Sequence, residues 1–138
     1  MDIVSLILEI NIYKAYFILN KCFISDIEYS HNNYRFDVIG VNLEENKIII
    51  LETKVSLNDY KKDNYIECCN ELYIITNDYS VKLESEKNRN ITGIIYYDTL
   101  RNSINVYKND ITNNNVKLNK DEVVKKIYNK YWNKIHKI

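Results

Sequence analysis

The fold of this chain is decided by residues 47–54, which read Lys47-Ile48-Ile49-Ile50-Leu51-Glu52-Thr53-Lys54. Four consecutive large aliphatic side chains predict a central β-strand that is buried on both faces. The run ends abruptly in a carboxylate and an ammonium group. Because side chains alternate along a strand, we expect Glu52 and Lys54 on one face and Thr53 on the other. An unpaired charge at the end of a buried strand is costly, so each charge needs a partner.

A second carboxylate, Asp37, interrupts another mostly apolar stretch, residues 34–43. This stretch is predicted to form a β-hairpin with the strand that ends at Glu52. A turn centred on Glu44-Glu45 pairs residue 41 with 48, 39 with 50, and 37 with 52. That register puts Asp37 on the same face as Glu52 and Lys54, whereas an odd connection would turn Asp37 away.

Two facing carboxylates repel each other unless a cation lies between them. Oxygen ligands suit Mg²⁺ or Mn²⁺, which retain water molecules that can act as nucleophiles. The Lys54 ammonium can orient such a water and offset the charge that develops on a phosphate. Asp37, Glu52 and Lys54 therefore form a complete hydrolytic set for a phosphodiester. The alternative is a cross-strand ion pair at a sheet edge; the preceding aliphatic run and the facing Asp37 favour the functional interpretation.

The rest of the chain is predicted to alternate between helices and strands. Ser56-Leu57-Asn58-Asp59 has the form of a capping box that opens a helix to about residue 70, and Asn119-Lys120-Asp121-Glu122 opens a final helix. The inner stripe of the final helix is expected to contain Val124, Ile127, Tyr128, Tyr131 and Ile135. The further elements are a helix over residues 3–20, strands over 22–29, 72–76, 91–97 and 103–107, and a charged loop over 77–90.

Length and composition place the chain among soluble proteins. Its 138 residues are 46% hydrophobic and 28% charged, and predict one domain spanning residues 1–138. The apolar N-terminal stretch is too short and too soon charged to be a membrane span or a signal peptide, so we expect a cytoplasmic protein without a membrane partner. Cys22, Cys68 and Cys69 show no disulfide or zinc spacing and are expected to be reduced. The formal net charge is zero, so any basic surface must be local.

Asp37 and the Glu52-Thr53-Lys54 triplet, in an α-β-β-β-α-β order, resemble the PD-(D/E)XK nuclease superfamily. Within it, residues 35–40, 56–60, 69–73 and 93–98 are similar to the MmcB-like DNA-repair group. The resemblance covers roughly residues 5–108. It implies a restriction-endonuclease-like α/β core, a mixed sheet flanked by helices, with a C-terminal β-hairpin and helix.

The resemblance also implies roles for individual residues. Asp37 and Glu52 would be ligands of a Mg²⁺ or Mn²⁺ ion, with the main-chain carbonyl of Thr53 as a further ligand, and Lys54 would activate water. Many members add an acid from the first helix, for which Glu9 is the candidate; a solvated position on that helix is the alternative for Glu9. Members often dimerise to cut two strands, so a homodimer is an expectation.

Lysines after the site and in the last helix are candidates for contact with nucleic acid. Lys61 and Lys62 follow the active strand, and Lys126 and Lys130 belong to a locally basic final helix. For both groups the alternative is a solvated helix face.

The leading hypothesis is a Mg²⁺-dependent DNA endonuclease that acts in DNA repair, recombination or mobile-element defence and recognises DNA structure rather than sequence. The alternatives are a non-catalytic nucleic-acid-binding module on the same fold and an effector that cleaves RNA.

Overall fold

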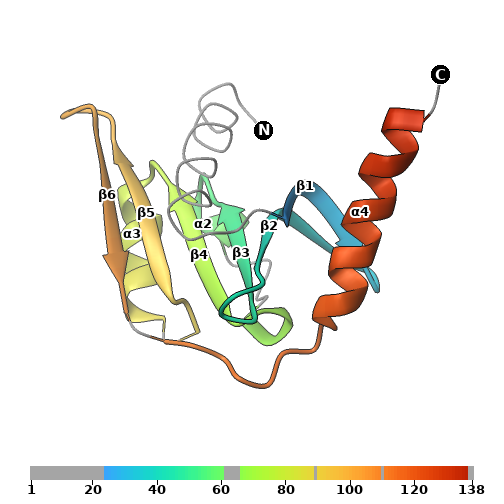
Figure 1. Ribbon diagram of the computed structural model, residues 1–138. Helices are drawn as coiled ribbons and strands as arrows, with labels where there is room; N and C mark the ends of the chain where they lie inside the picture. The colour runs from blue at the N-terminus through green and yellow to red at the C-terminus, as the bar shows by residue number, and fades with distance from the viewer. Residues whose placement is uncertain (1–23, 61–65, 89, 110, 137–138) are drawn as a thin grey trace.

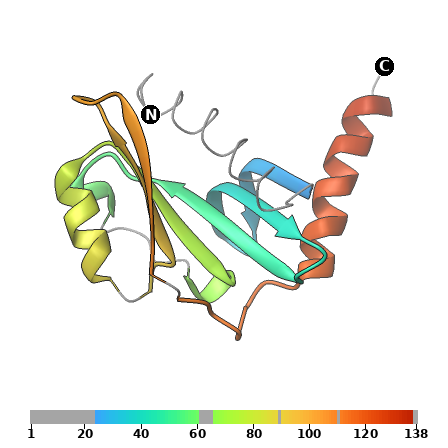
Figure 2. The same ribbon diagram turned by 60° about the vertical axis from the view of Figure 1, so that its left-hand side comes forward.

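The computed structural model describes residues 24–60, 66–88, 90–109 and 111–136. They form a mixed α/β structure around one six-stranded sheet in the order β1-β2-β3-β4-β5-β6 (Figures 1 and 2). The strands are β1 (Ile24–His31), β2 (Tyr34–Asn42), β3 (Lys47–Thr53), β4 (Glu71–Thr76), β5 (Gly93–Asp98) and β6 (Ser103–Lys108). The helical segments are α2 (Leu57–Tyr60), the 3-10 helix η1 (Ile66–Cys68), α3 (Tyr79–Lys87) and α4 (Lys120–His136).

The sheet combines hairpins at both sides with a parallel centre. β1, β2 and β3 form an antiparallel meander, β3, β4 and β5 run parallel, and β5 and β6 form a second antiparallel hairpin. Every strand expected from the sequence is therefore present where the structure describes it, with ends shifted by at most two residues. The β2–β3 register pairs Val41 with Ile48 and Ile39 with Ile50, as the sequence predicts.

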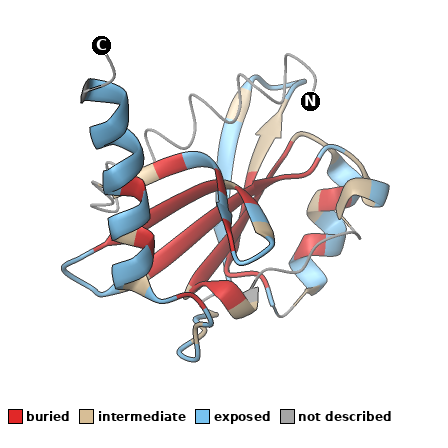
Figure 3. Ribbon diagram, turned by 90° about the vertical axis from the view of Figure 1, so that its right-hand side faces the viewer, coloured by how far each residue is buried: buried red, intermediate tan, exposed pale blue. Residues whose placement is uncertain are grey.

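Helices cover one face of the sheet. The larger core cluster contains Ile39, Ile48, Ile50, Leu72 and Ile74 from the strands, with Val81 of α3 and Val123 and Ile127 of α4 packed on them. Their neighbours along the strands, Val38, Ile49, Leu51, Tyr73 and Ile75, form a separate cluster, which strand alternation places on the opposite face. Figure 3 shows the central strands as a buried band. β3 is buried from Ile48 onward, as its aliphatic run predicts.

Two predicted segments are wrong in the structure. The segment 77–90, expected as a charged loop, contains α3, whose first turn is capped by the Asp78 carboxylate accepting the Val81 N–H at 3.0 Å. Only Val81 and Ser85 of this helix are buried, so its apolar pattern is too sparse to be recognised. The helix expected to run to about residue 70 is described only over Leu57–Tyr60, as α2; Ile66–Cys68 form the 3-10 turn η1, and Cys69 and Asn70 lead from it into β4.

The final helix begins where the sequence predicts, since the Asn119 side chain accepts the Glu122 N–H at 3.1 Å. Its inner stripe differs from the expected one. Val123 and Ile127 are buried, Val124 is half-buried, and Tyr128, Tyr131 and Ile135 are exposed. The reason is tertiary: α4 packs against the β1 edge through its first turns and then extends past the sheet (Figures 1 and 3).

The predicted helix over residues 3–20 and Cys22 lie outside the described residues. Cys68 and Cys69 are buried free thiols, as expected. Across the described part of the chain, none of the helices combines the length and the apolar character needed to span a bilayer.

Candidate active site

The candidate site lies where β2 and β3 stop pairing through their main chains. The ladder's last pair is Val38 with Leu51, and beyond it two carboxylates take over the hydrogen bonding. The Asp37 N–H donates to Glu52 Oε1 at 3.0 Å, and the Thr53 N–H donates to Asp37 Oδ2 at 2.8 Å. Each strand's acid thus accepts an N–H of the other strand, and the predicted meeting of Asp37 with Glu52 is confirmed.

Glu52 occupies an unusual electrostatic position. Its side chain is only 4% exposed and lies against a second carboxylate. Burial and, secondly, the negative charge of Asp37 raise the pKa of Glu52 from its ordinary 4.5 to about 9, although the Asp37 N–H bond and the Lys54 charge act in the opposite direction. Without a nearby cation, the Glu52 carboxyl group is therefore expected to keep its proton at neutral pH.

Lys54 follows β3 directly and is 3% exposed. Its main-chain N–H donates to the Ile75 carbonyl at 2.9 Å, which extends the parallel pairing with β4 beyond the strand end. Its ammonium lies 4.0 Å from Asp59 Oδ1, and it is near enough to Glu52 to influence that carboxyl group. The buried Lys54 side chain therefore lies beside Asp59 and within electrostatic range of Glu52.

Asp59 is a site residue that the sequence identified only as a cap. Its main-chain N–H donates to the Ser56 hydroxyl at 3.2 Å, and its carboxylate accepts the Val55 N–H at 3.2 Å. This is the predicted capping box, with the return bond made one residue before Ser56. The same carboxylate faces Lys54, so the start of α2 orients the site lysine. The sequence feature that could have identified Asp59 as a partner of Lys54 is its position five residues after that lysine.

A backbone irregularity borders the site on the other side. The β1–β2 register places Glu28 opposite Asp37, yet the ladder skips this pair, and Glu28 has a positive φ of 49°. Phe36 and Ile39 belong to the same core cluster although they are three residues apart, so side-chain alternation shifts around Asp37. A non-glycine residue in this conformation costs about 1–2 kcal/mol. The distortion lies opposite Asp37, where this residue contacts Glu52.

The donor set fits a hard divalent cation. Asp37 and Glu52 provide carboxylate oxygens in one place, and the like-charge repulsion that raises the Glu52 pKa is what a cation would relieve. Within the described ranges, no three His, Cys, Asp or Glu side chains are grouped as a metal site, and Glu9 lies outside those ranges. The Thr53 side chain is buried, and its hydroxyl has no hydrogen-bond partner among the described residues. Alternation turns that hydroxyl away from Glu52, which leaves the main-chain carbonyl as the Thr53 group expected at the site.

Lys126 and Lys130, two candidates for contact with nucleic acid, hold α4 on β1. Lys130 Nζ lies 2.9 and 3.1 Å from the carboxylate oxygens of the buried Asp26. Lys126 Nζ donates to the Ser30 carbonyl and sits 5.3 Å from the centre of the Tyr29 ring. Contact of Lys126 and Lys130 with nucleic acid stays a prediction. Their packing against β1 was not predicted from the sequence. Lys61 and Lys62 lie outside the described residues.

Two hollows in the described part of the chain lie away from these acids. A groove of about 430 Å³ separates α4 from the Ile24–Ser25 segment and Leu43, and a smaller one of about 230 Å³ is lined by Lys126 and Lys130.

Comparison with known proteins adds no relative: no protein-family model, curated protein or solved structure matches this chain.

Proposed function

We propose that this chain is a divalent-metal-dependent nuclease of the PD-(D/E)XK type that hydrolyses phosphodiester bonds in DNA. The observation that carries the proposal is the reciprocal contact of Asp37 and Glu52 beside the buried ammonium of Lys54. The strand directions from β1 to β4 support it, since they agree with the order that the resemblance implies. A restriction-endonuclease-like core is part of the same proposal.

Each residue has a stated role. Asp37 and Glu52, with the Thr53 carbonyl, would hold Mg²⁺ or Mn²⁺. When bound, such an ion supplies an activated water and offsets negative charge on the phosphate. Lys54 presents a fixed ammonium that orients the attacking water and stabilises the developing charge on the phosphate. Asp59 positions Lys54, and the short hydrogen bonds to main-chain N–H groups hold both acids in place.

The site's surroundings favour recognition of DNA form over DNA sequence. The chain has 138 residues, which leaves little surface for reading base edges. We therefore propose action on DNA ends, branches or single strands, in DNA repair, recombination or mobile-element defence.

The test is cleavage of labelled duplex, single-stranded and branched DNA, and of RNA, with Mg²⁺, Mn²⁺ or EDTA. The variants are Asp37→Asn, Glu52→Gln and Lys54→Met, each checked for folding by circular dichroism. The matched control is Glu71→Gln, because Glu71 is also a strand glutamate that is 4% exposed, but it pairs with Lys47 away from Asp37.

We expect metal-dependent DNA cleavage that falls by about 10²- to 10³-fold or more in each site variant. The Glu71→Gln control should retain cleavage under conditions in which the variant is folded. Cleavage that is unaffected in the folded Lys54→Met and Glu52→Gln variants, or absent with every substrate and metal, would reject the proposal. Preferential cleavage of RNA would instead support the alternative that the chain is an RNA-cleaving effector.

A further inference from the structure

The second half of α4 carries exposed aromatic rings. Tyr128 is 60% and Trp132 49% exposed, and their rings stack with centroids 6.0 Å apart and planes 20° apart. Tyr131, also exposed, lies one turn from Tyr128 and contacts Lys134, whose ammonium is 5.6 Å from the Tyr131 ring centre. Large aromatic side chains on a solvent-facing helix are unusual unless a partner covers them.

The charge of this region is one-sided. Residues 123–136 contain four lysines and no carboxylate. Lys126 and Lys130 are directed at β1, where Asp26 neutralises Lys130. Lys125 has the helical spacing that places it on the face of Tyr128 and Trp132. The aromatic residues thus lie in a stretch of α4 whose own charges are all positive. The nearest acids lie at its borders: Asp121 lines the first-turn end of the adjoining groove, and the buried Asp26 accepts the Tyr131 hydroxyl at 3.4 Å.

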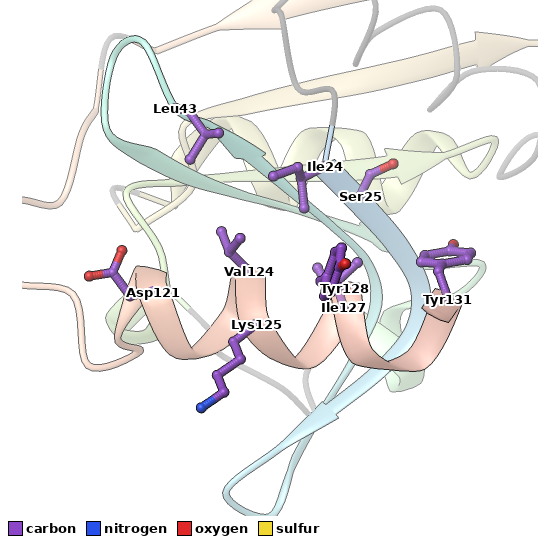
Figure 4. A pocket seen from close by; sticks show the side chains of 9 residues that line it. All are labelled: Ile24, Ser25, Leu43, Asp121, Val124, Lys125, Ile127, Tyr128 and Tyr131. Atoms are coloured by element: carbon purple, nitrogen blue, oxygen red, sulfur yellow. The ribbon is translucent and has the colours of Figure 1, made fainter. Parts of the chain in front are cut away.

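An apolar groove adjoins these rings. It has a volume of about 430 Å³ and lies between α4 and the Ile24–Leu43 side of the sheet. Figure 4 shows Tyr128 and Tyr131 rising from α4 toward Ile24 and Ser25, while the Lys125 side chain points away from the groove. Flat apolar surfaces thus line the groove, and a cation lies at its outer side.

Charge decides between the occupants of this surface. A second copy packed α4 against α4 would bring two lysine-rich helices together and leave their charges unopposed. A partner with flat apolar faces and a continuous negative charge fits both features, and unpaired bases on a phosphate backbone have both. Paired bases have their faces covered by neighbours in the duplex, so they cannot stack on Tyr128 or Trp132.

We propose that the α4 surface, formed by Lys125, Tyr128, Tyr131 and Trp132 with the adjoining groove, binds single-stranded DNA by stacking unpaired bases on its aromatic rings. The choice of DNA rests on the proposed nuclease function. Through this surface the chain would bind the unpaired strand of a DNA end or branch. Phosphates would lie beside Lys125 and Lys134, since Lys126 and Lys130 are held against β1.

Trp132 provides the readout, because it is the chain's single tryptophan. Oligothymidylate of about 16 nucleotides, titrated into the full chain in EDTA, is expected to quench Trp132 fluorescence, since a base stacks on the indole. A duplex of equal length should bind at least about 10-fold more weakly. Anisotropy of a labelled oligonucleotide measures the same binding in variants that lack the tryptophan.

Substitutions separate stacking from charge. Tyr128→Ala and Trp132→Ala should each weaken single-strand binding by about 5- to 100-fold, whereas Trp132→Phe should retain most of it. Lys125→Glu should reduce the salt dependence of binding. The controls are Tyr79→Ala and Lys87→Glu on α3, since Tyr79 is 59% exposed, like Tyr128, and lies on a different helix. Both controls should bind as the unaltered chain does.

Three outcomes would overturn the proposal. The first is unchanged binding by folded Tyr128→Ala and Trp132→Ala proteins, and the second is binding of duplex DNA as tight as that of single-stranded DNA. The third is tighter binding of an oligouridylate RNA or an acidic peptide than of single-stranded DNA.

Failure of the proposed nuclease function is recognised separately. Single-strand binding in EDTA that depends on Tyr128, without cleavage of any substrate, would reject the nuclease and keep the α4 surface. Cleavage by a protein whose single-strand binding does not depend on Tyr128 would keep the nuclease function and reject the α4 surface.

Discussion

Two buried glutamates lie at opposite ends of the parallel pair β3–β4, and the structure treats them differently. Glu71, at the start of β4, is 4% exposed and lies 3.1 Å from Lys47, with the Tyr73 hydroxyl donating to it at 2.8 Å. Glu52, near the end of β3, is equally buried but faces the Asp37 carboxylate. Glu71 is satisfied by this chain's own cation, whereas Glu52 is left with a like charge.

The difference separates a structural acid from a site that calls for a ligand. The bond to Glu71 raises the pKa of Lys47, as a stabilised ion pair should. At the other end, burial and, secondly, repulsion from Asp37 raise the pKa of Glu52 to about 9, which is typical of groups arranged for function rather than for stability. The following predictions test this contrast, beginning with the largest expected change in stability.

Replacing the two glutamates by glutamine should change stability in opposite directions. Glu71→Gln removes the buried carboxylate that faces Lys47 and leaves Lys47 only its surface pair with Glu45. It is expected to lower the free energy of unfolding by about 2 kcal/mol, a value below that of a fully buried pair because Lys47 is partly exposed. Glu52→Gln removes a carboxylate that resists ionisation and should raise the free energy of unfolding by about 1 kcal/mol at pH 8 in EDTA. Urea unfolding measures both, and destabilisation by both substitutions alike would remove the contrast.

The Glu71 end also depends on Gly93. A Cβ at this position would lie 2.6 Å from Tyr73 Cε1 and 2.7 Å from the Tyr107 carbonyl oxygen. Gly93→Ala should therefore displace the Tyr73 ring, weaken its bond to Glu71, and cost about 2 kcal/mol of stability. Thermal unfolding of Gly93→Ala beside Gly93→Ala/Tyr73→Phe tests the mechanism. If removing the Tyr73 hydroxyl destabilises the Gly93→Ala protein as much as it destabilises the unaltered chain, then Gly93→Ala does not act through the bond between Tyr73 and Glu71.

Stability without metal should fall as pH rises. In the unfolded chain Glu52 loses its proton near pH 4.5, and in the folded chain near pH 9, so between these values the folded state holds more protons. The contribution from Glu52 is therefore present at low pH and is lost as pH rises through this window. Melting temperatures in EDTA from pH 5 to pH 9 should decline, and Glu52→Gln should flatten the decline by an amount equivalent to about 1 kcal/mol or more.

Adding Mn²⁺ provides the complementary measurement. Because a cation binds the ionised pair, Mn²⁺ should raise the melting temperature of the unaltered chain more at pH 8 than at pH 6. The Asp37→Asn variant should show no such gain. An equal shift at both pH values would place the metal elsewhere.

The smallest expected effect concerns the strained strand beside Asp37. Glu28 adopts a positive φ of 49°, and its pair with Arg35, at 3.7 Å on the surface, contributes little. Glu28→Gly should be more stable than Glu28→Ala by about 1 kcal/mol, since both lose the side chain and only glycine adopts this conformation without strain. Equal unfolding midpoints for the two variants would show that the strand relaxes without strain.

Much of the site could be predicted because it depends on local patterns. The aliphatic run before Glu52 fixed β3 as a central strand, and the Glu44-Glu45 turn fixed the register that brings Asp37 to Glu52. The capping box placed α2 after Lys54. The helix α3 and the buried face of α4 could not be predicted in this way, because Val81 and Ser85 give α3 little periodicity and the orientation of α4 depends on its contacts with β1.

The strands, their hairpin register and the triplet of Asp37, Glu52 and Lys54 can be predicted from local pattern, since alternation and turn position act over a few residues. Which groups lie beside those charges depends on tertiary contacts. The tertiary structure placed Lys47 beside Glu71 but Asp37 beside Glu52, turned Lys126 and Lys130 toward β1, and left Tyr128 and Trp132 in solvent. These outcomes depend on which distant segments pack together, and the burial and charge that result are properties of the assembled fold.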